Sequence, residues 1–242
     1  MASRNEFLNS VRNALKINKD DSLREPRQPL PAPLENVMQA IVAGELLERF
    51  EAELDTLGGI AYRASSLSML EGILRPIVDQ APGSPVVLSR NALLSQLHVA
   101  EMVGRWSLRA SSWPDSAPEQ AGSAHFREDC FAAQVGITGA DFALAETGSL
   151  VLTSFTEGSQ LASLAPTTHV VLYRRSQLRA TLDEVLQNLP VSRDPARPSP
   201  ARSVVFVTGT SRTADIEQIL VRGVHGPREL HAILVEEACL AG

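Results

Sequence analysis

Residues 59–89 read GIAYRASSLSMLEGILRPIVDQAPGSPVVLS, and this stretch decides the fold class. It predicts a strand over 59–63 and a short buried strand over 85–89. Between them, apolar residues at helical spacing predict a helix that ends or kinks near Pro76. These apolar residues are Leu67, Leu70, Ile73 and Leu74. Strands rich in valine and isoleucine that alternate with helices are typical of a parallel sheet covered by helices.

The same alternation continues on both sides of this stretch. A long helix is predicted over about 34–56, with an apolar stripe formed by Leu34, Val37, Met38, Ile41, Val42 and Leu46. Further along, the pattern predicts a strand over 168–174, a helix over 176–189 and a last strand over 231–236. We therefore expect residues 34–242 to form one α/β domain of three layers, in which a mainly parallel sheet carries helices on both faces.

The N-terminal segment is expected to be an arm outside this domain. Residues 1–23 contain a short amphipathic helix over 3–17, and residues 24–33 hold four prolines, which predicts an extended linker. The arm either packs on a neighbouring subunit, which would give a homo-oligomer, or covers part of its own domain. A second proline-rich segment, 190–202, is interpreted as a surface loop because too little chain follows it for another domain.

Composition excludes several classes of function. The formal net charge of -6 disfavours nucleic acid and anionic membranes as partners. The chain has no signal-peptide run and no apolar segment of membrane length, so we expect a cytoplasmic protein. Its two cysteines, Cys130 and Cys239, belong to no C-x-x-C pair, which argues against a self-contained iron–sulfur cluster or a cysteine-rich zinc site. No metal site is predicted.

The first candidate site is the loop Thr208–Asp215, which follows an apolar strand and is expected to open a helix. Its backbone N–H groups, hydroxyls and guanidinium suit a carboxylate or a phosphate. The candidate ligand-binding residues are Gly209, Thr210, Ser211, Arg212 and Thr213. The alternative is a capped helix start, in which Thr213 is the N-cap and Asp215 complements the helix dipole.

The second candidate lies between two strands predicted near 142–145 and 149–154. A tight turn at Thr147–Gly148 joins them and places Glu146 at a strand end, where it could act as nucleophile or general base, paired with the carboxylate of Asp141. Gly148 is assigned to the ligand-binding set. The alternative is a turn glutamate that is hydrogen-bonded to nearby amides.

The third candidate is His225. It lies on a predicted loop and is followed by Gly226 and a proline. An imidazole can exchange protons near neutral pH, so His225 is a candidate catalytic residue and Gly226 a candidate ligand contact. The alternative is an exposed loop histidine. His169 begins a buried strand and is given a structural role, and the remaining histidines show no ligand spacing.

These segments together resemble a known family. GITGADFALAETGSLVL at 136–152, the stretch Pro166–His169, and TGTSRTADIEQILVRGVHGPRELHAILVEE at 208–237 are similar to the LUD-domain family, in particular its lactate-utilization protein C (LutC/YkgG) branch. The resemblance is strong over about 134–236. Thr210 departs from it, since the family form is G-P-S-R-T, and this changes the stiffness of the loop.

The resemblance implies a fold related to the NagB/RpiA/CoA-transferase group and a role in oxidising L-lactate to pyruvate. It also implies two companion proteins that carry the iron–sulfur chemistry, so this chain would be a non-redox component that binds a small carboxylate or a phosphorylated cofactor. Two alternatives stay open. Glu146–Thr147–Gly148 is similar to the Glu-x-Gly of some CoA transferases, which implies acyl transfer through Glu146. The proline-linked N-terminal helix favours an assembly or regulatory module without catalysis.

Overall fold

The computed structural model describes residues 4–17, 41–114, 119–190, 203–213, 221–222 and 226–240. The chain divides into two units, Met1–Ala40 and Ile41–Gly242. The described part of the first unit is helix α1, Arg4–Ile17, at the position predicted for the arm. The predicted linker and the start of the domain at residue 34 lie outside the described residues.

The second unit is built on a six-stranded parallel sheet with strand order β1-β12-β7-β4-β2-β3. All five neighbouring pairs are parallel. In spatial order the strands are β1 Ile60–Ala64, β12 Glu229–Val235, β7 Thr168–Tyr173, β4 Val135–Gly139, β2 Val86–Leu88 and β3 Ala110–Ser112. The central strands are buried on both faces, as expected for a parallel sheet between two layers.

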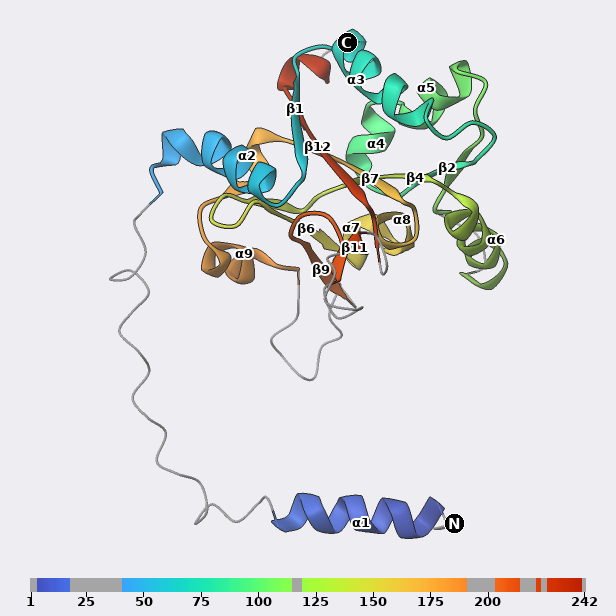
Figure 1. The fold of residues 1–242 in the computed structure, drawn as a ribbon, viewed down its shortest axis with the longest axis vertical. Coiled ribbons are helices and arrows are strands. Elements are labelled where there is room, and N and C mark those ends of the chain that lie inside the picture. Colours follow the sequence, from blue (N-terminus) through green and yellow to red (C-terminus); the bar gives the residue numbers. More distant parts are fainter. Residues whose placement is uncertain are drawn as a thin grey trace. The chain divides into compact units, whose positions relative to one another are not determined.

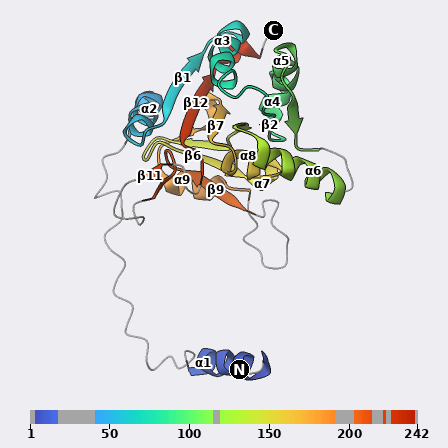
Figure 2. The ribbon, with the colours of Figure 1, turned by 45° about the vertical axis from the view of Figure 1, so that its right-hand side comes forward.

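Helices cover both faces of this sheet, which confirms the predicted α/β architecture (Figures 1 and 2). One face packs against α3 Leu67–Val78, α4 Ala92–Gln96 and α5 Val99–Arg105. The other packs against α2 Leu46–Thr56, α6 Glu119–Ala132 and α8 Leu161–Leu164. None of the helices in the described ranges is long and apolar enough to cross a lipid bilayer.

A second, four-stranded sheet covers part of the face that carries α2. Its order is β8 Leu178–Arg179, β5 Phe142–Leu144, β6 Ser149–Thr153 and β9 Val204–Val207. The predicted hairpin forms β5 and β6, which pair antiparallel. Ala143 and Leu150 face the parallel sheet, whereas Phe142 and Val151 face outward toward α9, Leu182–Asn188. Periodicity did not predict this sheet, because β6 pairs with β9 across more than fifty residues of chain.

Two predicted helices differ from their expected spans, and residues 34–40 of the first lie outside the described residues. Val42 has an extended backbone, a 3-10 turn (η3) spans Ala43–Glu45, and α2 starts only at Leu46; Gly44 in this turn is a weak helix former. The helix predicted from residue 176 starts at Leu182 instead. Its first residues form a 3-10 turn (η4, Arg175–Gln177) and strand β8, because Leu178 pairs with Ala143. The pairing between segments overrides the local helical spacing.

His169 is a buried polar residue at the start of β7. Its side chain is fully buried, and its Nε2 lies 2.9 Å from Thr138 Oγ1 on the neighbouring strand β4. Burial lowers the pKa of His169 to about 3, so the imidazole is neutral in the folded protein. This placement agrees with the structural role that the sequence suggested.

We predict that His169 makes stability depend on pH in the mildly acidic range. Because its pKa is lowered on folding, the stabilisation is fully present above the unfolded pKa of 6.5 and is lost as the pH falls below it. Between about pH 7.5 and about pH 5.5, the free energy of unfolding should fall by about 1.4 kcal/mol more in the wild type than in His169→Gln. Urea unfolding at both pH values measures this difference, and an equal fall in both proteins would contradict it.

Candidate functional site

Three of the predicted segments meet beside the C-terminal end of α2. The turn after Glu146 is joined to the loop after β9 by a chain of hydroxyl groups. Thr147 Oγ1 lies 2.7 Å from Ser149 Oγ, which in turn lies 2.7 Å from Thr208 Oγ1. Segments that are about sixty residues apart in the sequence are therefore in direct contact.

Two glycine turns make this contact possible. Gly148 (φ +61°) and Gly209 (φ +81°) both have the left-handed backbone that other residues rarely adopt. A Cβ on Gly148 would stand 2.4 Å from the backbone nitrogen of Leu54, and one on Gly209 would stand 2.6 Å from Cβ of Leu57. Both turns thus pack on the last turn of α2 and need glycine for close approach as well as for conformation.

The third segment joins through Ser211. The Ser211 N–H donates to the carbonyl of Pro227 at 2.9 Å, and Gly226 packs beside the Ser211 side chain. The Thr210 N–H points to the carbonyl of Leu57 at 3.4 Å. We call this assembly the motif cluster; it comprises Thr147–Ser149, Thr208–Ser211 and Gly226–Pro227. It lies beside the amino ends of β1 and β12, since Gly58 follows Leu57 and Arg228 follows Pro227.

One buried hydroxyl in the motif cluster, that of Thr210, is not satisfied by a hydrogen bond to the described residues. An unpaired buried hydroxyl costs free energy, and such groups in proteins are often completed by a bound molecule or water. The motif cluster therefore holds an unpaired hydrogen-bonding group at the position where this chain departs from the family pattern.

Glu146 lies next to the motif cluster and is held by the start of α9 and the residue before Thr181. Its carboxylate accepts a hydrogen bond from the Leu182 N–H at 3.0 Å, and its own N–H donates to the carbonyl of Ala180 at 3.1 Å. Glu146 thereby anchors the start of α9 with one oxygen, as the turn interpretation expected. Its other oxygen accepts no hydrogen bond from any of the residues described.

Arg212 and Thr213 have extended backbone in the structure. They form the short strand β10, paired antiparallel with β11, Val221–Arg222. The helix expected after Thr213 would cover residues outside the described part of the chain, so the helix start stays a prediction. Asp215 and the candidate catalytic His225 lie outside the described residues.

The carboxylate partner of Asp141 is Glu157 and not Glu146. Asp141 accepts hydrogen bonds from Thr153 N at 2.7 Å and Thr156 Oγ1 at 2.9 Å, and burial raises its pKa. Its charge contributes to raising the pKa of Glu157, for which burial is the main cause. Sequence reasoning missed Glu157, because it stands in the unpatterned helix α7 (Ser154–Glu157) and is buried only by tertiary packing.

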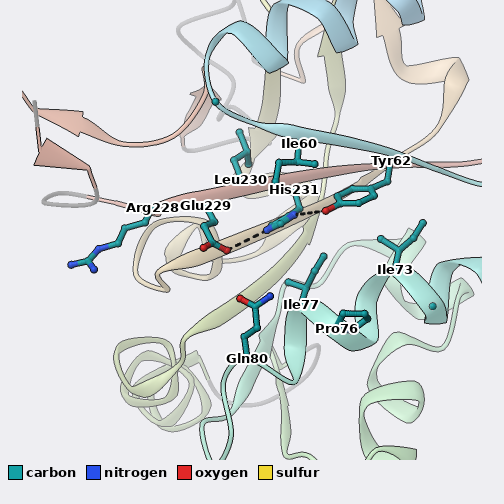
Figure 3. Close-up of a pocket in the computed structure, with 12 residues that line it drawn as sticks. Ile60, Tyr62, Ile73, Pro76, Ile77, Gln80, Arg228, Glu229, Leu230 and His231 are labelled. Atoms are coloured by element: carbon teal, nitrogen blue, oxygen red, sulfur yellow. Dashed lines mark hydrogen bonds and ion pairs between the residues drawn. The ribbon is translucent and has the colours of Figure 1, made fainter.

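A cavity of about 580 Å³ lies at the amino ends of β1 and β12, beside α3 (Figure 3). In this view His231 stands between Tyr62 and Glu229, and Ile73 and Ile77 of α3 face them. Tyr62 Oη lies 3.2 Å from His231 Nδ1, and His231 Nε2 lies 3.5 Å from Glu229 Oε2. Sequence spacing gave no sign of this group, because Tyr62 and His231 are 169 residues apart.

The Tyr62–His231 pair is uncharged in the folded protein. Burial lowers the pKa of His231, and the hydrogen bond that His231 donates to Glu229 only partly opposes this. Burial also raises the pKa of Tyr62. With Glu229 ionised, Nε2 carries the ring proton and Nδ1 accepts from the Tyr62 hydroxyl. The arrangement can pass a proton between Tyr62 and Glu229, and its cavity begins at Gly58 and Arg228, the residues next to the motif cluster.

Comparison with known proteins identifies the family. The LUD domain family model matches residues 47–235. The lactate utilization protein C of Bacillus subtilis is 32% identical over 173 residues, which is 68% of each chain. The same-named protein of Exiguobacterium sp. is 27% identical and covers 98% of this chain and 97% of its own length. The uncharacterized protein YkgG of Escherichia coli is 27% identical over 98% of this chain and its own full length.

A solved structure supports the fold. The crystal structure of a DUF162 family protein from Deinococcus radiodurans aligns with a TM-score of 0.52 and 20% identity, and covers 81% of this chain and 99% of that one. At this identity the likeness concerns the fold alone. The family model spans the motif cluster and both sheets. The chain therefore belongs to the LUD domain family, as its motifs around Glu146 and Gly209 predicted.

Proposed function

We propose that this chain is a non-redox component of a system that oxidises L-lactate to pyruvate, and that it binds a small carboxylate or a phosphorylated cofactor at the motif cluster. One observation carries the proposal: three segments that bear the family motifs, far apart in sequence, meet at the end of α2. The assignment to lactate oxidation is supported by the relatives that are named lactate utilization protein C.

The chemistry of the motif cluster suits an anion. Hydroxyl groups of Thr147, Ser149 and Thr208 line up in one chain, and Thr210 offers a buried hydroxyl that has no hydrogen-bond partner among the described residues. Arg212 follows Ser211 directly in the chain, and His225 precedes Gly226. Hydroxyls, backbone N–H groups and a guanidinium are the donors that bind carboxylate and phosphate in proteins. The neighbouring cavity of about 580 Å³ gives room for the rest of such a ligand.

The two cysteines support a role outside the redox step. Both thiols are buried and free, in different parts of the core. Burial raises the pKa of Cys130 to about 12, which keeps its sulfur protonated, and Cys239 Sγ donates to the carbonyl of Ala64. An iron–sulfur cluster is usually held by four thiolates. The proposal therefore assigns electron transfer to iron–sulfur companion proteins in the cytoplasm, with α1 as the arm through which copies of this chain would associate.

We predict that lactate growth depends on Arg212 and on the charge of Glu146. In a strain without the gene, Arg212→Ala should fail to restore growth on L-lactate while growth on glucose stays normal. Glu146→Gln keeps an oxygen that can accept the Leu182 N–H and removes only the charge and the basicity. We expect it to fold with an unchanged melting temperature and to support growth poorly.

The matched control is Glu184→Gln, a neighbouring surface carboxylate on α9 that binds the Ala180 N–H outside the motif cluster. It should restore growth like the wild type. Full growth with both Arg212→Ala and Glu146→Gln would reject ligand binding at this site and favour an assembly or regulatory module. Unimpaired lactate growth without the gene, in a strain that lacks a paralogue, would reject the lactate role itself.

The alternative function, acyl transfer, predicts a covalent intermediate on Glu146. Its unpaired carboxylate oxygen would attack the thioester carbonyl, the carbon–sulfur bond would break, and coenzyme A would leave as the thiolate. Incubation with acyl-CoA donors and mass spectrometry should then detect an adduct on Glu146 that is missing in Glu146→Gln. Its absence with acetyl-, propionyl- and lactoyl-CoA would count against this alternative and leave the binding proposal intact.

A further inference from the structure

The parallel sheet has a crevice that neither the family motifs nor the proposed function uses. After β2 the chain runs through α4 and α5 to β3, whereas after β4 the next strand of this sheet is β7, on the opposite side. Because β2 and β4 are neighbours, their connections leave in opposite directions. Open α/β sheets bind ligands at such a point, beyond the carboxyl ends of the two strands.

A cavity of about 440 Å³ occupies this position. Arg90 lines it after the end of β2, Asp141 after the end of β4, and Arg174 after the end of β7. Phe155, half exposed, adds an apolar wall. The motif cluster lies at the amino ends of β1 and β12, so the two places are at opposite edges of the same sheet.

Two arginines in this cavity carry unneutralised charge. Two arginines elsewhere on the sheet are paired with carboxylates: Arg109 with Asp129 and Arg175 with Glu236. Arg90 and Arg174 form no ion pair with any residue in the described ranges. Arg90 donates to the carbonyl of Phe155 at 2.8 Å.

Arg174 is less completely satisfied than Arg90. Its Nη2 donates to Gln96 Oε1, but its Nε is buried and lacks a hydrogen-bond partner among the residues described. A buried donor on a charged group is costly to leave unpaired, so an acceptor is expected from outside the chain. A carboxylate or phosphate supplies the acceptor oxygens that the fork of a guanidinium fits best.

Asp141, in the same cavity, requires a hydrogen-bond donor from the ligand in addition to the anionic group that the arginines require. Its Oδ2 accepts hydrogen bonds from the Thr153 N–H and from Thr156 Oγ1, and the Thr153 side chain also favours the ionised carboxylate. The pKa of Asp141 is raised by burial although two arginines line the cavity, so the guanidinium groups do not neutralise it. A ligand that satisfies all three side chains needs an anionic group and, at some distance from it, a hydroxyl that donates to Asp141.

The residues behind the cavity hold these groups in place. Glu157 accepts hydrogen bonds from Ser89 Oγ at 2.5 Å and from Asn91 Nδ2. Gln177 accepts from the backbone N–H of Arg174 at 2.7 Å and donates to the carbonyl of Ala140. The strand ends that carry Arg90, Asp141 and Arg174 are therefore fixed before a ligand arrives, which is the arrangement of a built site.

From this geometry we propose that the cavity lined by Arg90, Asp141 and Arg174, which we call the carboxyl-end cavity, is a second binding site. Its ligand is a small organic anion that carries a hydroxyl group. The carboxylate or phosphate of the ligand lies between Arg90 and Arg174, and its hydroxyl donates to Asp141. The site lies apart from the motif cluster and does not depend on the function proposed for it.

Calorimetric titration of the full-length chain tests the site. L-lactate serves as the hydroxycarboxylate probe and glycerol 3-phosphate as the hydroxyphosphate probe, at constant ionic strength, and we expect at least one to bind in the millimolar range or tighter. Arg174→Gln and Arg90→Gln should each weaken that binding about tenfold or more. Arg175→Gln removes the same charge from the next residue, which is paired with Glu236 outside the cavity, and should change nothing.

Further variants distinguish binding at this site from binding at the motif cluster and from nonspecific electrostatic attraction. Ser211→Ala, in the motif cluster, should leave the binding unchanged. Asp141→Asn should reduce the ratio of the affinity for L-lactate to the affinity for propionate, because propionate lacks the hydroxyl that Asp141 binds. Thermal unfolding confirms that each variant is folded. If Arg174→Gln does not fold, the binding measured with Arg90→Gln decides whether the site exists. The proposal is overturned if neither probe binds, if Arg90→Gln binds as the wild type does, if Arg175→Gln weakens binding equally, or if Ser211→Ala abolishes it.

Discussion

The buried carboxylate of Glu157 ties the second sheet to the first, and the arrangement of the strand ends at the carboxyl side of the parallel sheet depends on this contact. Glu157 ends α7, which follows β6 of the second sheet, and its side chain reaches Ser89, Asn91 and the N–H of Gly139 at the ends of β2 and β4. A buried carboxylate is costly unless its oxygens are bonded, so these donors must be in place when the sheets dock. The requirement fixes the strand ends around the carboxyl-end cavity.

A second constraint acts at the other edge of the sheet, at the end of α2. Gly148 and Gly209 approach the backbone of α2 so closely that any side chain would collide with it. This explains in physical terms why both family motifs contain glycine at these positions. The hydroxyl chain and the Ser211–Pro227 hydrogen bond then close the motif cluster around that contact. The motif cluster is thus a consequence of how two turns pack on one helix.

The two edges differ in their electrostatics. The chain as a whole carries a formal charge of -6, yet the carboxyl-end cavity is lined by two arginines that have no carboxylate partner in the described ranges. Among the described residues, the cavity beside the motif cluster is lined by a single arginine, Arg228, and by a tyrosine–histidine pair with a carboxylate next to it. Local placement of charge, and not the net charge, therefore decides what each edge can bind.

The sequence by itself determined the alternation of strands and helices, the hairpin at Thr147–Gly148, the burial of His169 and the family motifs. These follow from side-chain spacing within one segment and from turn chemistry, both of which are local. Only the tertiary structure decided that Leu178 forms a strand, that the charge of Asp141 acts on Glu157, and that Tyr62 meets His231. It also decided that Arg174 Nε is buried without a hydrogen-bond partner among the described residues. Each of these depends on segments far apart in sequence, whose contact is set by packing and hydrogen-bond satisfaction, which no local period encodes.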